Sequence, residues 1–173
     1  MSKKSIICVM ALSAWMSSAA WASGSANANI TPSATITNNC LITGGSLSFG
    51  AYDPLGGAAV TATTTIGVQC TNGMTAPYVT LGQGLHAATG STDAAPLRQL
   101  NNGSSGAINN LTYNLYTTSS YDSGPVWDNV TGVQSPTPSG SSQNMTVYGK
   151  ITSGQSTAVA GTYNDTVVAT VSF

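Results

Sequence analysis

The chain has 173 residues, only 5% of them are charged, and Glu is absent. This low charge density excludes a basic surface for nucleic acid or an anionic membrane, and it excludes helices built on Glu–Lys pairs. Thr, Ser, Gly and Asn are abundant, a composition typical of many short strands joined by Gly and Asn turns.

The first 22 residues have the pattern of a secretory signal. Lys3 and Lys4 form a basic start, residues 6–15 are an apolar run, and Ala20-Trp21-Ala22 has small residues at the two outer positions of a cleavage pattern. The apolar run is too short for a permanent membrane anchor. We therefore expect a signal peptide over residues 1–22 and a mature chain that starts at Ser23. Residues 26–28 offer a weaker, second cleavage pattern.

Two cysteines remain after such a cleavage, Cys40 and Cys70. Two cysteines in an exported chain predict one disulfide, which the chain-entropy model values at roughly 3–4 kcal/mol for this loop. A metal site is the alternative, but it lacks ligands, because His86 is the one histidine and there is no second cysteine pair. We expect no metal and no cofactor.

The elements expected in chain order are short strands. Residues 35–37, 40–42 and 47–49 have strand-like alternation, and a turn cluster follows at residues 53–57. The clearest strands lie at residues 60–70, 78–81, 111–116 and 145–152, with a shorter candidate at residues 97–100. About seven short strands with turn signals between them predict an all-β sandwich.

The last expected strand, residues 161–173, alternates up to the carboxyl terminus, so we expect no further strand after it. An arm of residues 23–37 precedes Cys40 and has apolar residues at spaced positions: Ala28, Ile30, Ala34 and Ile36. A sheet that lacks one strand, on a chain with a spare strand-like arm, predicts strand exchange between neighbouring molecules. The alternation could also arise by chance in a disordered tail.

An ordered series of motifs extends over nearly the whole mature chain. It comprises Cys40, residues 47–54 (LSFGAYDP), 66–71 (IGVQCT), 81–84 (LGQG), 98–100 (RQL), 111–116 (LTYNLY), Trp127, 148–151 (YGKI), 161–167 (GTYNDTV) and 171–173 (VSF). In this series the chain resembles the spore coat protein U domain, which also forms the major subunits of archaic chaperone–usher pili.

The resemblance implies an incomplete immunoglobulin-like β-sandwich over residues 38–173, completed by a strand from another subunit. A periplasmic chaperone would fill the groove first, and at an outer-membrane usher the arm of the next subunit would replace it. Val171 and Phe173 would contact the chaperone, with the Phe173 ring closing the core. The resemblance also implies export through the periplasm to the cell surface, adhesion and biofilm formation.

Pro32 departs from the pattern of a donor strand. It shares the parity of Ile30 and Ile36, yet it has no backbone N–H to donate to a ladder. Either its nitrogen faces away from the ladder, or Pro32 separates the donor from the domain's own first strand. The second alternative would shift the donor toward residues 27–31.

Other polar and aromatic residues have simpler interpretations. His86, beside a Gly-rich turn, is expected in a solvated loop, and Asp165 is expected at a strand edge rather than as a catalytic base. Trp127 is expected to be a core or edge aromatic more often than a sugar platform. The sequence has no Gly-x-Ser-x-Gly nucleophile turn and no paired acidic motif, so we expect no enzyme, no catalytic residue and no small-molecule substrate.

These observations favour a structural pilus subunit whose partners are pilin subunits, a chaperone and an usher. The alternatives are a spore or cell-surface coat protein with the same domain, and a small secreted carbohydrate-binding sandwich. An exported hydrolase is a distant fourth.

Overall fold

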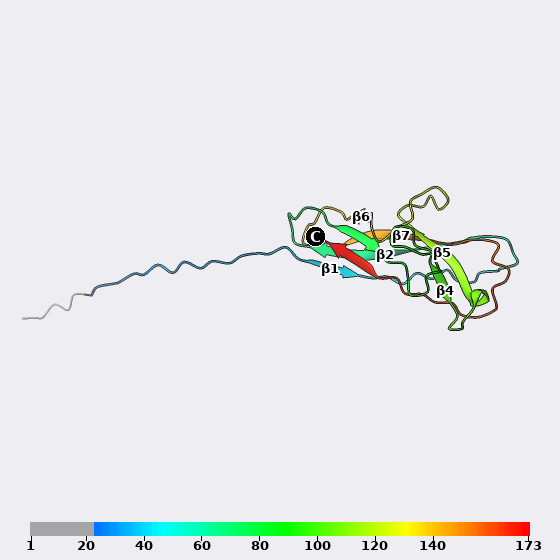
Figure 1. The fold of residues 1–173 in the computed structure, drawn as a ribbon. Coiled ribbons are helices and arrows are strands. Elements are labelled where there is room, and N and C mark those ends of the chain that lie inside the picture. Colours follow the sequence, from blue (N-terminus) through cyan, green and yellow to red (C-terminus); the bar gives the residue numbers. More distant parts are fainter. Residues whose placement is uncertain (1–22) are drawn as a thin grey trace, which may run out of the picture. The chain divides into compact units, whose positions relative to one another are not determined.

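Short strands joined by loops make up the computed structural model (Figure 1), which describes residues 23–173. The chain divides into two units, residues 1–35 and 36–173. In the first unit, described residues 23–35 have no regular secondary structure. The expected signal peptide lies outside the described residues. None of the helical segments within residues 23–173 has the length and apolarity to span a bilayer.

The second unit contains two antiparallel sheets. The larger has the strand order β1-β2-β7-β5-β4, and the smaller has the order β6-β3-β8. The elements are β1 (Cys40–Thr43), β2 (Val60–Cys70), β3 (Tyr78–Leu81), β4 (Gln99–Asn101), the 3-10 turn η1 (Ala107–Asn109), β5 (Asn110–Tyr116), β6 (Val133–Gln134), β7 (Gln143–Ile151) and β8 (Ala169–Ser172). The predicted all-β sandwich class is confirmed.

Alternating side chains explain why the sheets pack face to face. In β2, Ile66 and Val68 are buried, whereas Thr63 and Thr65 are exposed. Successive side chains of a strand point to opposite faces, so one face enters the core and the other meets water. One hydrophobic cluster joins the two sheets and includes Val79 and Leu81 of β3, Leu115 of β5 and Val147 of β7.

Trp127 lies at the centre of this core. Its side chain is 1% exposed, and its indole N–H donates a hydrogen bond to the Val79 carbonyl at 2.8 Å. Buried tryptophans usually satisfy their one donor in this way. The expectation of a core aromatic is confirmed, and an indole so deeply buried cannot serve as a platform for a sugar.

The predicted disulfide is present and joins the first two strands. Cys40 and Cys70 are directly opposite in the β1–β2 ladder, with their Cα atoms 4.1 Å apart. The bond ties the start of the folded unit to the end of its longest strand. It therefore holds the edge strand β1 in register.

Strand bounds differ from the sequence-based expectation at both ends of the unit. Residues 47–49 form no strand, and of residues 161–173 only Ala169–Ser172 form one, β8. The short β6 was not expected, and it raises the number of described strands to eight. The side chains of residues 47–49 and 163–168 do alternate, but residues 47–49 make no backbone–backbone hydrogen bond to another described residue, and residues 163–168 make only isolated ones. A ladder needs two strands.

Candidate functional site

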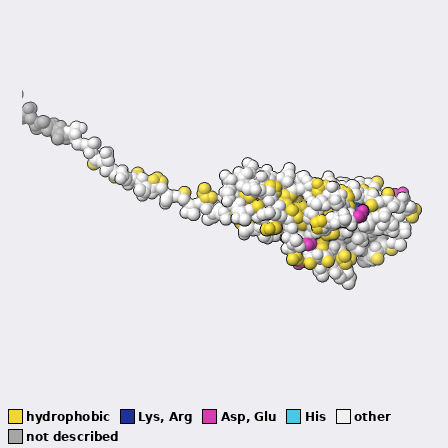
Figure 2. All heavy atoms as spheres, turned by 90° about the horizontal axis from the view of Figure 1, so that it is seen from above, with side chains coloured by type: hydrophobic (Ala, Val, Ile, Leu, Met, Phe, Trp, Pro, Cys, Tyr) yellow, Lys and Arg dark blue, Asp and Glu magenta, His cyan; other side chains and the backbone are white. Residues whose placement is uncertain are grey.

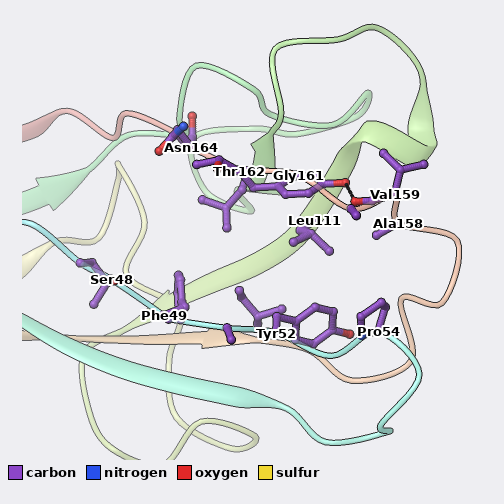
Figure 3. Close-up of a pocket in the computed structure, with 18 residues that line it drawn as sticks. Ser48, Phe49, Tyr52, Pro54, Leu111, Ala158, Val159, Gly161, Thr162 and Asn164 are labelled. Carbon is purple, nitrogen blue, oxygen red and sulfur yellow. Dashed lines mark hydrogen bonds between the residues drawn. The ribbon is translucent and has the colours of Figure 1, made fainter.

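An open groove runs between two edges of the second unit. Residues 44–54 form its first edge, and residues 158–169 form its second edge. Two adjoining cavities make up the groove, with volumes of about 740 and 470 Å³. Figure 3 shows the larger one, with Phe49, Tyr52 and Pro54 along one side and Gly161 and Thr162 along the other.

The floor of the groove is the apolar inner face of the larger sheet. Leu111 and Ile151 underlie the larger cavity, and Ile66, Leu115 and Val147 underlie the smaller one. These are core side chains, yet no strand covers them along the groove. An apolar surface of this kind, bordered by strand edges, is suited to receive an extended segment with apolar residues at alternate positions.

The first edge closes on the sheet through a glycine. A Cβ at Gly149 of β7 would come within 2.5 Å of the Leu47 side chain and within 2.9 Å of the Phe49 ring. Only the absence of a side chain there lets Leu47 and Phe49 lie directly over β7. The Phe49 ring also meets Tyr113 edge-on, with centroids 6.0 Å apart. Phe49 thus stands between the two cavities, both of which it lines.

Backbone groups on both edges face the groove without a ladder. Within residues 23–173, residues 45–52 make no backbone–backbone hydrogen bond. On the second edge, Asn164 pairs with Asn101, and the carbonyls of Thr166 and Val168 accept from the amides of Leu85 and Gly82. Neighbouring residues of a strand direct their backbone groups to opposite sides. The backbone groups of residues 163, 165 and 167 therefore point toward the groove.

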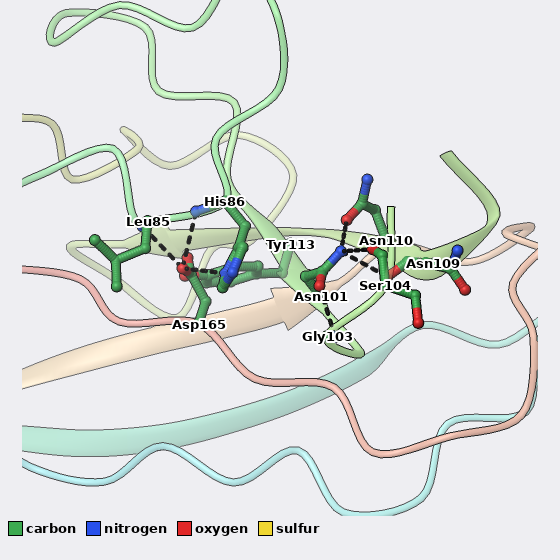
Figure 4. Close-up of polar contacts among 9 residues, drawn as sticks. All are labelled: Leu85, His86, Asn101, Gly103, Ser104, Asn109, Asn110, Tyr113 and Asp165. Carbon is green, nitrogen blue, oxygen red and sulfur yellow. Dashed lines mark hydrogen bonds and ion pairs between the residues drawn. The ribbon is translucent and has the colours of Figure 1, made fainter. Parts of the chain in front are cut away.

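Asp165 holds the second edge in place through its side chain, which is only 1% exposed. Its carboxylate accepts hydrogen bonds from the amides of Leu85 (2.9 Å) and His86 (3.2 Å) and from the Tyr113 hydroxyl (2.7 Å). The His86 Nδ1 atom lies 3.2 Å from the same carboxylate (Figure 4). Burial, reinforced by the bond to Asp165, raises the pKa of Tyr113, so the phenol stays protonated and remains a donor.

The turn that meets Asp165 needs a glycine. Gly84 has a φ of +89°, and a Cβ at this position would collide with the Asp165 carboxylate. Because only glycine adopts such a φ without strain, the turn can present two successive amides to one carboxylate. His86 lies in an exposed loop, as expected, but its contact with Asp165 was not anticipated.

Arg98 is the second polar anchor near the groove, and its side chain is fully buried. Its guanidinium donates to the carbonyls of Leu81 (2.9 Å), Gly82 (2.7 Å) and Trp127 (2.7 Å). Burial lowers the pKa of Arg98 from its usual value. These bonds tie β4 to the end of β3 and to the Trp127 segment.

Removing the Asp165 carboxylate should destabilise the subunit strongly. Asp165→Ala leaves two amides and a buried phenol without their acceptor, at a cost of about 2–4 kcal/mol in the free energy of unfolding. Asp165→Asn keeps one acceptor oxygen and should lose less. Urea unfolding of the purified subunit measures both values. An Asp165→Ala variant as stable as the wild type would show that the carboxylate does not hold this edge.

The arm residues of the predicted donor strand are exposed in the structure. Ile30 is 88% exposed and Ile36 is 85% exposed, and Ala28 and Ala34 are exposed too. Their function as a donor strand stays a prediction, as do the two interpretations of Pro32.

At the other end of the chain, Val171 pairs with Val79 in the β3–β8 ladder and is partly buried. Phe173 is 63% exposed. The expectation that its ring closes the core is wrong for the subunit alone, because β8 ends at Ser172 and the ring follows the last ladder position. Contact of Val171 and Phe173 with a chaperone stays a prediction.

Sequence reasoning missed the polar anchors. Asp165 was placed at a strand edge, but its bonds to residues 85 and 86 span about 80 positions of sequence and left no local pattern. The sequence does offer one indication of their importance: charged residues are rare in this chain, and Arg98 and Asp165 are two of them. A charged residue within an apolar strand pattern usually has a specific partner.

Fold and groove together define a class of protein, a β-sandwich with an open strand-edge groove. Comparison with known proteins identifies the family: the Spore Coat Protein U domain model matches residues 25–170. The chain also resembles Protein U of Myxococcus xanthus, with 42% identity over 135 residues, covering 75% of this chain and 72% of that protein. The chain belongs to the Spore Coat Protein U domain family, a family of structural surface proteins.

Proposed function

We propose that the chain is a structural subunit of a surface pilus, assembled by the chaperone–usher pathway through donor-strand exchange. In this proposal the arm of one subunit fills the groove of the next, and the fibre serves adhesion and biofilm formation. A periplasmic chaperone occupies the groove before assembly, and an outer-membrane usher exchanges it for the arm. The subunit has no catalytic role.

The observation that carries the proposal is the groove with its two unpaired edges. An added strand would supply backbone partners to residues 163, 165 and 167 and would cover the apolar floor. Two buried Ile side chains contribute roughly 3–6 kcal/mol before ordering costs, and each ladder hydrogen bond adds about 0.5–1.5 kcal/mol. The sum is enough for a lasting attachment between subunits.

The near absence of charge in the groove also suits an apolar, uncharged segment such as the arm. The groove lining contains neither Lys nor Arg, and its one acid, Asp165, is already hydrogen-bonded. Residues 23–39 contain no charged side chain. Figure 2 shows the same character on one face of the molecule, where hydrophobic side chains gather in patches and acidic ones are isolated.

The experiment is the isolation of surface fibres from cells that express the full chain. Sheared fibres should contain this chain as multimers that resist SDS without heating and dissociate on boiling. Deletion of residues 23–33, or of the chaperone gene, should remove the multimers. Fibres that form unchanged without residues 23–33 would contradict strand donation by the arm.

The family description favours a second candidate, a coat subunit of a spore or cell surface with the same domain. Genes for a chaperone and an usher beside this gene would favour the pilus. Immunogold labelling separates the two candidates directly, because a pilus subunit labels filaments, whereas a coat subunit labels a continuous layer.

A further inference from the structure

The two cavities of the groove adjoin at a shared boundary. Residues from both edges and from the floor line both cavities: Leu47, Phe49, Leu100, Asn164 and Asp165. Asp165 is fixed there by its hydrogen bonds, and the Phe49 ring is fixed by Tyr113 and by the close approach over Gly149. A strand lying in the groove must cross this boundary with small side chains and can place large ones only on either side.

The distance between the cavities can be counted along the edges. On the first edge, residues 44–46 line only the smaller cavity, and residues 48, 50, 51, 52 and 54 line only the larger one. The middle members of these two sets, Gly45 and Ala51, are six positions apart. On the second edge, residues 158–163 line only the larger cavity and residues 166, 167 and 169 only the smaller one, and Gly161 and Val167, near the middles of these two sets, are also six positions apart. Six residues of strand span about 20 Å and return the side chain to the same face.

The arm has the same spacing. Every even position from 24 to 36 is apolar or Gly, and every odd position from 23 to 37 is Ser, Asn or Thr. Among the even positions, the branched aliphatic side chains are Ile30 and Ile36, six residues apart. Between them lie Pro32 and Ala34, whose side chains are small enough for the boundary at Phe49 and Asp165.

We propose that the groove recognises the arm of a second copy of this chain by the six-residue spacing of Ile30 and Ile36, one in each cavity. This inference rests on the proposed function and adds its register. Pro32 and Ala34 then cross the boundary, so Pro32 lies within the donor strand. The donor occupies residues up to Ile36 rather than ending at residue 31.

Three variants test the spacing with unchanged composition. The exchange Ile36→Ala with Ala34→Ile gives a spacing of four, and Ile30→Ala with Ala28→Ile gives a spacing of eight. Making both exchanges restores six, displaced by two positions. All three keep two Ile on the apolar parity, and the altered side chains belong to the exposed arm. Domain folding is checked by the Cys40–Cys70 bond in the expressed chain.

SDS-resistant multimers of the full chain, assembled with its chaperone and usher, give the readout. Each single exchange should reduce multimers about tenfold or more, because one Ile leaves its cavity, whereas the double exchange should assemble like the wild type. If the single exchanges assemble like the wild type while Ile30→Asp still fails, the spacing is wrong and strand donation stands. If the double exchange fails as badly as the single ones, spacing is not what is recognised. A third outcome would overturn both proposals: the full chain stays monomeric, and deletion of its arm lowers its melting temperature. That result would show that the arm fills the groove of its own subunit.

Discussion

Ile30→Asp and Ile36→Asp should each abolish fibre formation while the subunit still folds. If the arm is a donor strand, each carboxylate must enter a groove whose floor is Leu111, Ile151 and other core side chains. An unpaired carboxylate in such a site costs several kcal/mol, and the contribution of the replaced Ile is lost as well. Assembly should fall at least about a thousandfold, since each 1.4 kcal/mol is a factor of ten.

The matched control is Ser33→Asp, which adds the same charge at the opposite parity. Its side chain would point to solvent, so fibres should form nearly as in the wild type. Multimers on unheated SDS gels measure assembly, and the amount of disulfide-bonded subunit in the periplasm measures folding. Equal assembly by the charges of both parities would show that residues 23–37 are only a tail.

Deletion of residues 169–173 should abolish accumulation of the subunit in the periplasm. The deletion removes β8, the ladder partner of β3, and part of the second edge of the groove. Val79 and Leu81 of β3 are buried in the intact subunit, and without β8 the strand β3 would lose its ladder partner at every position. A three-stranded sheet reduced to β3 and the two-residue β6 cannot retain a sandwich. Immunoblots of periplasmic extracts measure the loss, and normal accumulation would contradict this account.

The exposed ring at the terminus supplies a finer control. Since Phe173 is 63% exposed and follows β8, Phe173→Ala should change the free energy of unfolding of the isolated subunit by less than about 0.5 kcal/mol. If Phe173 contacts the chaperone, the same variant should still lower accumulation in cells. A large loss of stability in the purified variant would instead assign the ring to the subunit core.

The local alternation of apolar and polar residues determines much of the fold. β2 and β3 have the bounds predicted from alternating apolar residues, and β5 and β7 differ by one or two positions at their ends. In a strand with one buried face, apolar and polar residues must alternate, so the strand can be predicted from a short stretch of sequence. The Cys40–Cys70 bond followed from the number of cysteines in an expected exported chain. The arm likewise shows its parity in the sequence alone.

Only the tertiary structure shows which segments with strand-like alternation lack a neighbouring strand. Residues 47–49 and 163–168 alternate like strands, but only the fold shows that both border an open groove. The hydrogen bonds of Asp165 to Leu85 and His86, and of Arg98 to Trp127, join segments far apart in the sequence. No local periodicity encodes such contacts, because each depends on where the backbone of another segment passes. The exposure of Phe173 was decided in the same way, by the ladder position at which β8 ends.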